Sequence, residues 1–301
     1  MVACVIVHLV DGTFELFRYY LAPSAAFDRT TPPELRGVRG VVASVLGMLE
    51  GGATHAGVAT DHVVESFRNA LWAGYKTGDG MDPVLYAQFA PLEEALSALG
   101  VTVWPMVEFE ADDALGVAAA MAAADARVEQ VRVCTPDKDL GQCVRGERVV
   151  QLDRRTGEVR TEAGVRQKFG VGPASIPDWL ALVGDAADGF PGLPGWGAKG
   201  AAAVLARYER LEQIPKLALE WDVPVRGALR LATTLAEQWE YALLFRTLAT
   251  LRADVPLGTD VDGLRWTGPR PDFAEWAARL GAPALHERAQ TLAASRSRPL
   301  P

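Results

Sequence analysis

The chain has 301 residues, is 49% hydrophobic and 23% charged, and carries a formal net charge of −8 at pH 7. These values are typical of a globular protein with one large or two small domains, and no apolar run reaches the ~18 residues that a membrane span needs. The acidic net charge disfavours a polyanionic partner, but much of the excess lies in a few acidic clusters, so local basic stripes can still guide a phosphate backbone.

The first segment, Val2–Val10, is short and apolar, has no basic leader and runs straight into Asp11-Gly12. It therefore predicts a strand rather than a signal peptide. The three cysteines, Cys4, Cys134 and Cys143, form an odd set without metal-ligand spacing. We expect reduced thiols and a cytoplasmic protein.

Residues 1–172 alternate short β-branched apolar runs with helical patterns, which predicts an α/β domain built around a mostly parallel sheet. A turn-prone stretch at 154–157 predicts a hairpin that leads to Val159. The predicted strands are Val2–Val10, Ala56–Thr60, Val101–Trp104, Val131–Thr135 and Val149–Leu152. The predicted helices are Glu34–Leu49, Pro91–Leu99 and Ala111–Ala124.

Residues 62–90 form an insert that is longer than a simple crossover between strands. It carries Arg68 and Lys76, which on one helix would face the same way because they are about two turns apart. The insert is either a solvated amphipathic helix or a mobile basic arch over a neighbouring site.

After residue 172 strand-like runs largely vanish, so we expect a helical subdomain over residues 173–301. One apolar run, Trp179–Val183, resembles a further buried strand followed by acidic residues. We expect a loop over Asp254–Arg270 and one or two closing helices over Phe273–Ala293.

Carboxylates cluster where the predicted buried runs end. Ligands of an open parallel α/β sheet bind just beyond the carboxyl ends of its strands, and unpaired buried carboxylates are prohibitively costly. Oxygen-only clusters suit hard divalent cations, so they predict a site for several Mg²⁺ or Mn²⁺ ions. Taken singly, each cluster is also compatible with a polar turn or with charge complementation at a helix start. The residues concerned are Asp11, Asp61, Glu110, Asp112, Asp113, Asp137, Asp139, Asp185 and Asp188.

A glycine-rich segment begins at Gly192 and continues through Gly195 and Gly197 to Lys199. It resembles a helix-hairpin-helix at about 184–207, in which backbone N–H groups of a tight turn face phosphate oxygens and Lys199 adds a charge. Such contacts position a duplex without reading its sequence. The alternative is a Gly/Pro loop without a binding role.

In chain order these motifs resemble the 5′-nuclease family, which includes the 5′–3′ exonuclease domain of bacterial DNA polymerase I, phage 5′ exonucleases and flap endonucleases. The resemblance covers roughly residues 2–250 and implies a PIN-like α/β fold with a helical C-terminal subdomain. No polymerase-like segment follows, so we expect a stand-alone nuclease. The motifs are Val10-Asp11-Gly12, Asp61, Phe67-Arg68, Tyr75-Lys76, Glu110–Asp113, Thr135–Asp139, Gly184–Asp188 and Gly192–Lys199.

The resemblance implies hydrolysis of DNA phosphodiesters with two Mg²⁺ or Mn²⁺ ions, one activating water and one stabilising the leaving 3′ oxygen. It places Asp11, Asp61 and Asp112 at the first ion. It places Asp137, Asp139 and Asp188 at the second, with Glu110, Asp113 and Asp185 in support. It assigns contacts with the scissile or neighbouring phosphates to Arg68, Lys76 and Arg18, and DNA binding to Tyr75 and the hairpin, which in the family often holds K⁺. One departure is Gly189, which replaces a frequent Asn.

The implied substrates are 5′ flaps and nicked or gapped duplexes, including RNA-primed ones. We expect a monomer that associates with the nucleoid in the bacterial cytoplasm and acts in primer removal and repair.

Three alternatives explain less of the sequence. A haloacid-dehalogenase-like phosphatase matches Leu9–Thr13, but its nucleophilic Asp would have to stand where this chain has Leu9. A PIN-class ribonuclease lacks the hairpin and the second acidic doublet. A non-catalytic DNA-structure binder should have lost ligand residues, and none is lost.

Overall fold

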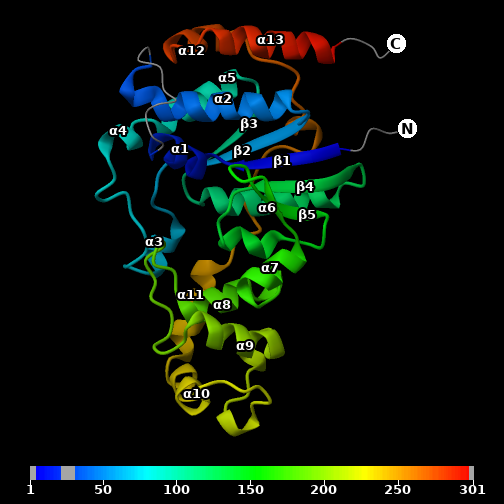
Figure 1. The fold of residues 1–301 in the computed structure, drawn as a ribbon. Helices are drawn as coiled ribbons and strands as arrows, with labels where there is room; N and C mark the ends of the chain where they lie inside the picture. Colours follow the sequence, from blue (N-terminus) through cyan, green and yellow to red (C-terminus); the bar gives the residue numbers. More distant parts are fainter. Residues whose placement is uncertain (1–4, 22–30, 298–301) are drawn as a thin grey trace.

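A six-stranded sheet forms the centre of the computed structural model, which describes residues 5–21 and 31–297 (Figure 1). The strand order is β3-β2-β1-β4-β5-β6. β1 to β5 are parallel, and β6 is antiparallel to β5, so the predicted mostly parallel sheet is confirmed. The strands are β1 Val5–Asp11, β2 His55–Asp61, β3 Thr102–Met106, β4 Val128–Cys134, β5 Val149–Asp153 and β6 Glu158–Arg160.

The five predicted strands are all present, with ends that differ by three residues or fewer where the structure describes them. The start of the first predicted strand, including Cys4, lies outside the described residues. The predicted hairpin turn joins β5 to β6, where Gly157 N–H donates to the Asp153 carbonyl.

Helices cover both faces of the sheet because successive side chains of the strands alternate between them. Val10 of β1 packs into the core beneath α1 (Gly12–Leu21), α2 (Arg36–Glu50) and α5 (Phe89–Ala98). Leu9 packs on the other face against α6 (Ala111–Ala124). The three predicted helices correspond to α2, α5 and α6.

The strand order reverses at the centre of the sheet. The chain runs outward from β1 to β2 and β3, and then returns to add β4 on the other side of β1. Ligands of doubly wound sheets bind at such a switch point, beyond the carboxyl ends of the strands. Asp11 ends β1, and Thr135–Asp139 follow β4 directly, so topology brings these segments together.

The second half of the chain is helical and encloses its own hydrophobic core. Its main helices are α7 (Glu162–Phe169), α8 (Ile176–Val183), α9 (Ala198–Tyr208), α10 (Ala228–Glu237) and α11 (Trp239–Ala249). The expectation of a buried strand at Trp179–Val183 is wrong, because this run is the last part of α8. A short, fully apolar run has no periodicity that separates a strand from a buried helix. Pro177 near the helix start favours the helix, and Gly184 ends it.

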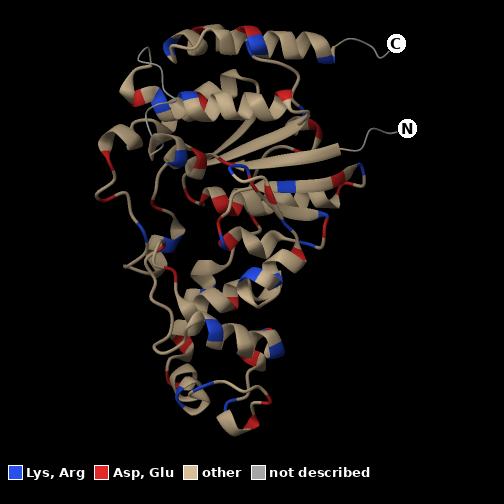
Figure 2. Cartoon of the chain, viewed as in Figure 1, with Lys and Arg blue, Asp and Glu red and all other residues tan. Residues whose placement is uncertain are grey.

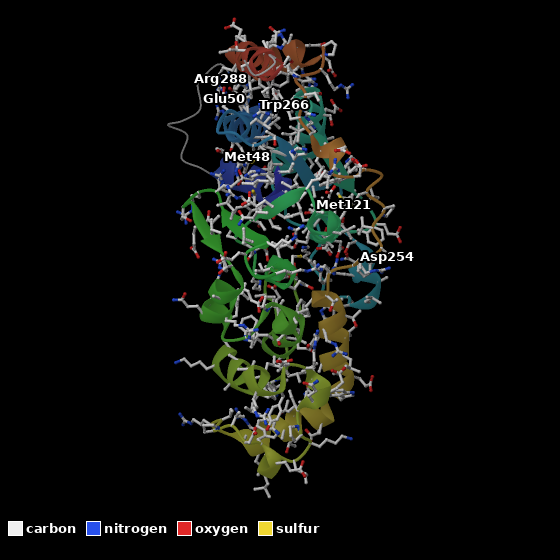
Figure 3. The ribbon with its side chains drawn as sticks, turned by 90° about the vertical axis from the view of Figure 1, so that its right-hand side faces the viewer. Met48, Glu50, Met121, Asp254, Trp266 and Arg288 are labelled. Atoms are coloured by element: carbon white, nitrogen blue, oxygen red, sulfur yellow. The ribbon has the colours of Figure 1, made fainter. Side chains whose placement is uncertain are left out.

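The last helices return to the sheet, so residues 173–297 are not one spatial unit. α12 (Phe273–Arg279) and α13 (Ala284–Arg296) pack over α5 and α2, at the top of Figure 1. The Trp266 indole donates to the Leu99 carbonyl at 2.8 Å, and Arg288 pairs with Glu50 at 2.6 Å (Figure 3). None of the helices in the described parts of the chain combines the length and apolar character that a membrane crossing requires.

The insert contains two short helices, α3 (Phe67–Leu71) and α4 (Pro83–Tyr86), joined by a loop. Of the two alternatives for the insert, the single amphipathic helix that would carry both Arg68 and Lys76 is not found. Arg68 lies in α3, which ends at Leu71, and Lys76 lies in the loop beyond it. Three glycines in residues 74–80 make a continuous helix unfavourable there.

The loop of the insert is anchored on the loop after α8. Lys76 N–H donates to the Asp188 carbonyl at 3.0 Å, and the Trp72 indole donates to the Gly189 carbonyl at 3.0 Å. Gly189 has φ +80°, and a Cβ there would lie 2.0 Å from the carbonyl oxygen of Gly74. Glycine is thus the residue that allows the two backbones to meet.

Candidate metal centre and nucleic-acid interface

Two carboxylate triads lie beyond the sheet, where the α/β part meets the helical part. Asp112, Asp137 and Asp139 form one triad, and Asp139, Asp185 and Asp188 form the other. In each triad, one oxygen of every carboxylate lies within 4.8 Å of those of the other two. The triads share Asp139, so they form one continuous acidic centre.

The chain positions these carboxylates from three different elements. Asp112 lies in the first turn of α6, whose positive dipole end favours a carboxylate. Asp137 follows β4, and its Oδ1 accepts from the Asp139 N–H at 2.9 Å, which turns the chain into a 3-10 helix (Asp139–Cys143). Asp185 and Asp188 lie on a tight loop closed by paired backbone bonds between Asp185 and Phe190.

Asp11 and Asp61 line the same centre from the ends of β1 and β2 without belonging to either triad. Asp11 accepts from the Thr135 hydroxyl at 3.0 Å and from the Phe14 N–H at 2.8 Å. Asp61 accepts from the Ala111 N–H, at the start of α6, at 2.8 Å. These bonds hold Asp11 through both of its carboxylate oxygens and Asp61 through Oδ1.

The carboxylates repel one another in a poorly solvated place. Burial is the main cause that raises the pKa of Asp11 to about 7, and the charges of Asp61 and Asp137 add to it. Burial and neighbouring carboxylates also raise the pKa of Asp112 and Asp139 well above the usual range. A centre of this kind binds protons when no other cation is available.

Asp139 provides the test of whether divalent cations fit. Its Oδ1 is buried and has no hydrogen-bond partner among the residues that the structure describes. A buried carboxylate oxygen without a partner is costly, unless a ligand satisfies it. The shared position of Asp139 and its all-oxygen neighbours match the donor set that Mg²⁺ and Mn²⁺ prefer.

Two lysines supply positive charge at the rim of the centre. Lys76 Nζ lies 2.7 Å from Glu110 Oε2 and 3.0 Å from Asp188 Oδ1. Burial alone would lower the pKa of Lys76, but Glu110 and Asp188 raise it well above its usual value. Lys138, between the two acids of its own motif, pairs with Asp185 at 2.5 Å. Both lysine side chains are 31% exposed, so both are accessible to a ligand.

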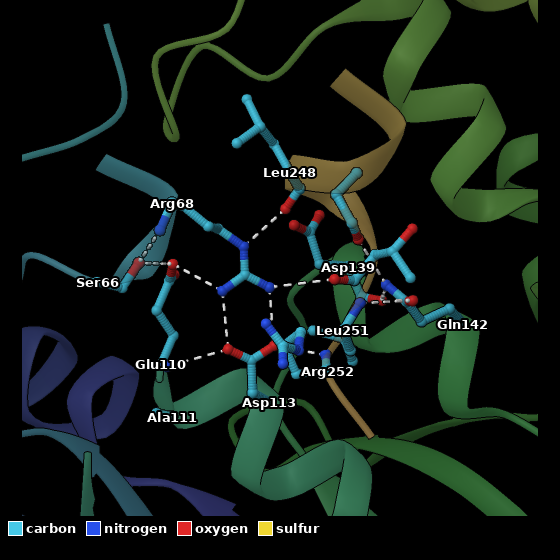
Figure 4. A network of polar contacts seen from close by, with 12 residues as sticks. Ser66, Arg68, Glu110, Ala111, Asp113, Asp139, Gln142, Leu248, Leu251 and Arg252 are labelled. Carbon is cyan, nitrogen blue, oxygen red and sulfur yellow. Dashed lines mark hydrogen bonds and ion pairs between the residues drawn. The ribbon is translucent and has the colours of Figure 1, made fainter. Parts of the chain in front are cut away.

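Glu110 and Asp113 face basic side chains and belong to neither triad (Figure 4). Asp113 makes a bidentate pair with Arg68, with N–O distances of 2.7 and 2.8 Å. Glu110 accepts from Arg68 at 2.9 Å, and burial is outweighed by Lys76 and Arg68, which lower the Glu110 pKa to about 2. The Arg68 side chain is 3% exposed, so it does not reach an external phosphate in this arrangement.

Two other predicted DNA contacts are also engaged within the protein. Tyr75 is 3% exposed and packs in the helical core, with its hydroxyl 3.3 Å from Glu110. Its ring is thus not available to stack on a base. Arg18 pairs with Glu15 and lies over the ring of Tyr19, although its side chain remains 24% exposed.

The predicted hairpin joins α8 to α9. Gly192 has φ +68°, and a Cβ there would lie 2.3 Å from the backbone nitrogen of Gly184. The two ends of the loop therefore meet through glycine. Gly195, Gly197 and Lys199 are exposed, and the first N–H groups of α9 have no partner within the helix.

Sequence reasoning missed a basic residue beside this hairpin. The indole of Trp196 is buried and donates to the Leu231 carbonyl of α10 at 3.2 Å. This contact brings the exposed Arg230 so close that a Cβ on Gly195 would lie 3.0 Å from its guanidinium. In the described part of the chain, neither Lys199 nor Arg230 has a carboxylate partner. Figure 2 shows basic segments on α9 and around α10.

The signals for the missed residues differ. Lys138 stands between two ligand candidates, so its sequence position already indicates a counter-ion. No local pattern marks Arg230, which is 35 residues from the hairpin glycine and meets it only through the packing of Trp196.

Comparison with known proteins accounts for most of the chain. Residues 6–170 match the family model of the 5′-3′ exonuclease N-terminal resolvase-like domain, and residues 171–272 match that of the 5′-3′ exonuclease C-terminal SAM fold. DNA polymerase I of Pseudomonas aeruginosa is 36% identical over 270 residues, which cover 85% of this chain and 28% of that protein. The chain thus spans less than a third of this relative. A 5′-3′ exonuclease of Buchnera aphidicola is 27% identical over 253 residues, covering 83% of this chain and 87% of that protein.

Solved structures share the fold at low sequence identity. The T5 5′-exonuclease with bound zinc ions has a TM-score of 0.64 at 16% identity, covering 95% of this chain and 98% of that one. The catalytic core of Rad2 in complex with DNA substrate has a TM-score of 0.61 at 14% identity, covering 97% and 93%. With both family models matched over adjoining ranges, the chain belongs to the 5′–3′ exonuclease family.

Proposed function

We propose that this chain is a divalent-metal-dependent nuclease that hydrolyses DNA phosphodiesters at 5′ ends and at 5′ flaps. The observation that carries the proposal is the acidic centre, in which two carboxylate triads share Asp139, whose Oδ1 has no hydrogen-bond partner in the described part of the chain. Family membership supports the same reaction class.

The two triads would hold two Mg²⁺ or Mn²⁺ ions, with Asp11 and Asp61 supporting from the ends of their strands. When bound, such ions lower the pKa of an attacking water and stabilise the leaving oxygen of a phosphodiester. Lys76 and Lys138 would contribute from the rim, because each can exchange a carboxylate for a substrate phosphate. A cation at that place stabilises charge that develops on the phosphate.

The duplex would lie along the hairpin between α8 and α9. Lys199 and Arg230 are exposed cations without a carboxylate partner in the described residues. Arg230 lies next to the Gly195 backbone, and Lys199 follows Gly195 by four residues in the chain. Unpaired cations are the groups that release counter-ions on DNA and produce salt-dependent affinity. We assign K⁺ binding at the hairpin, RNA-primed substrates, a monomeric state and a cytoplasmic location to the same proposal.

A cleavage assay tests the proposal. Purified protein is incubated with a 5′-labelled flap duplex, with a 3′-flap duplex of the same sequence as control, in Mg²⁺, Mn²⁺, Ca²⁺ or EDTA. We expect cutting of the 5′ flap in Mg²⁺ and Mn²⁺ alone, because Ca²⁺ relaxes the ligand geometry. Undiminished cutting in excess EDTA would exclude the metal centre, and equal cutting of both flaps would exclude 5′ selectivity.

The Asp139→Asn variant sharpens the same assay. It removes the carboxylate that both triads share, so cleavage should be abolished while DNA binding remains intact or becomes tighter. Near-normal turnover at low Mg²⁺ would remove Asp139 from the catalytic centre.

A further inference from the structure

Arg68 is fully engaged inside the protein. A guanidinium has five N–H donors, and those of Arg68 make five hydrogen bonds. Three go to carboxylate oxygens of Glu110 and Asp113, and two go to the carbonyls of Leu248 and Thr250. No donor remains for a substrate phosphate unless one of these bonds breaks.

These bonds join three segments that are far apart in sequence (Figure 4). Arg68 belongs to α3 of the insert, Glu110 and Asp113 belong to the start of α6, and the two carbonyls belong to the end of α11. The last carbonyls of a helix have no partner within it, so a donor from elsewhere must satisfy them. Arg68 supplies that donor at 2.7 Å from Leu248 and 3.2 Å from Thr250.

Gln142 forms hydrogen bonds with the same end of α11 from the other side. Its amide nitrogen donates to the Ala249 carbonyl at 3.0 Å and to the Asp139 carbonyl at 2.8 Å. Its amide oxygen accepts from the Leu251 N–H at 3.2 Å. Arg68 and Gln142 therefore hold consecutive peptide groups of α11 between them.

Arg68 and Gln142, together with the end of α11 that they bind, are called the clamp. Each of these two residues also binds at or next to a candidate metal ligand. Asp113, which Arg68 binds, is the neighbour of Asp112 in the first turn of α6. Gln142 binds the main chain of Asp139 itself. Asp112 and Asp139 belong to the same triad. The end of α11 thus lies between the two elements that set the separation of these carboxylates.

We propose that Arg68 is a positioning residue that, together with Gln142, couples the end of α11 to the spacing of Asp112 and Asp139. The inference deepens the proposed function and rests on it for the identity of the metal centre. It also gives Arg68 a different role from contact with the scissile phosphate. Because α11 packs on α8 in the helical part, the clamp links the duplex-binding side of the molecule to the ligand geometry.

The test compares four proteins with the wild type: Arg68→Ala, Arg68→Lys, Gln142→Ala and Arg166→Ala. Arg166 is the matched control, because it is an exposed arginine whose ion pair with Glu162 is remote from the clamp. Mn²⁺ binding without DNA is measured by calorimetry, and hydrogen exchange is measured in the last turn of α11. Single-turnover cleavage at saturating enzyme is measured across a range of Mg²⁺ concentrations.

We expect Arg68→Ala to weaken Mn²⁺ binding by about 10–100-fold, the usual effect of losing a residue that orients metal ligands. Exchange at the end of α11 should accelerate, and high Mg²⁺ should restore much of the lost single-turnover rate. Arg68→Lys should recover part of the Mn²⁺ affinity, Gln142→Ala should shift it less in the same direction, and Arg166→Ala should match the wild type.

The proposal is overturned if Arg68→Ala binds Mn²⁺ like the wild type while its cleavage rate falls and stays low at high Mg²⁺. That pattern would instead indicate direct contact with the substrate phosphate. If Arg68→Ala does not fold, Arg68→Lys and Gln142→Ala decide the question by the same three measurements. Because Mn²⁺ binding and exchange need no DNA, a wild type that binds metal but cuts no DNA would refute the proposed function and leave this test intact.

Discussion

Removing the charge of Asp139 should stabilise the metal-free protein, although it should abolish cleavage. Asp139 is the carboxylate common to both triads, and burial, Asp137 and Asp188 all raise its pKa. Asp139→Asn keeps the shape of the side chain and removes the charge. The amide can also donate hydrogen bonds to the neighbouring carboxylates.

The size of the effect follows from the spacing of the ligand atoms. Two unit charges at the 4.8 Å limit of the triads repel by roughly 3 kcal/mol at an effective dielectric constant of about 20. Proton binding and Lys138 relieve part of this repulsion, and an imperfectly paired buried amide costs about 1–3 kcal/mol. We therefore expect a net gain of about 1 kcal/mol in the free energy of unfolding, or roughly 2–4 °C in Tm.

Thermal unfolding in EDTA at pH 7.5, and again with saturating Mn²⁺, measures this gain. Asp79→Asn is the control, because Asp79 is exposed on the loop of the insert. The wild type should gain more stability from Mn²⁺ than Asp139→Asn does. The difference in Tm between the two proteins should therefore become smaller or change sign in saturating Mn²⁺. An Asp139→Asn protein that is less stable than the wild type in EDTA would show that the acidic centre is not under electrostatic strain.

Three further predictions follow from the same structure. Burial raises the folded-state pKa of Asp11 from 3.8 to about 7, so between these two pH values the folded protein binds more protons than the unfolded chain. Tm in EDTA should therefore rise as the pH falls from 8 to 5.5, and a Tm that does not change with pH would contradict this prediction. Gly189→Ala should lower Tm and slow cleavage, because the new Cβ clashes with the Gly74 carbonyl and a left-handed backbone costs a further roughly 1–2 kcal/mol. The control is Gly80→Ala, which has φ +80° in open space and therefore only the backbone cost; equal losses of Tm in the two variants would refute the anchoring contact. Lys199→Ala should weaken duplex binding and reduce the salt dependence of the affinity by about one phosphate contact, while single-turnover cleavage at saturating enzyme stays unchanged. Lys76→Ala should slow that saturated rate. Equal slowing by both variants would refute the assignment of Lys199 to duplex binding and of Lys76 to the chemical step.

Much of the sheet was predictable because β-branched runs bounded by turn residues carry a local signal. The same holds for α6, where Glu110 and Asp113 form a capping box at the helix start. The last part of α8, Trp179–Val183, was predicted to be a buried strand, because its apolar run is buried and has no periodicity that indicates a helix. The sequence left open whether one helix carries Arg68 and Lys76, because their spacing alone does not reveal where a helix ends.

Residue type predicted the acidic centre better than it predicted the partner of each carboxylate. Asp112 and Asp113 are adjacent in sequence, yet Asp112 joins a triad and Asp113 binds Arg68. Which of two neighbouring acids faces outward depends on the rotation of α6, and that rotation is fixed by packing against β1, β2, β3 and β4. The Arg68–Asp113 pair and the packing of α6 on β1 join residues that are distant in sequence, so no local pattern encodes them.

The lysines at the rim explain how so acidic a centre can exist in a folded protein before a metal arrives. Lys76 lies between Glu110 and Asp188, and Lys138 lies against Asp185, so each occupies a place where a cation is needed. Their side chains are long and partly exposed, which lets them move when a stronger cation enters the triads. A lysine displaced in this way would keep its charge near the centre, where an incoming phosphate needs a partner. The same residues can therefore stabilise the metal-free fold and then assist the loaded one, which Arg68, with every donor held inside the protein, cannot do.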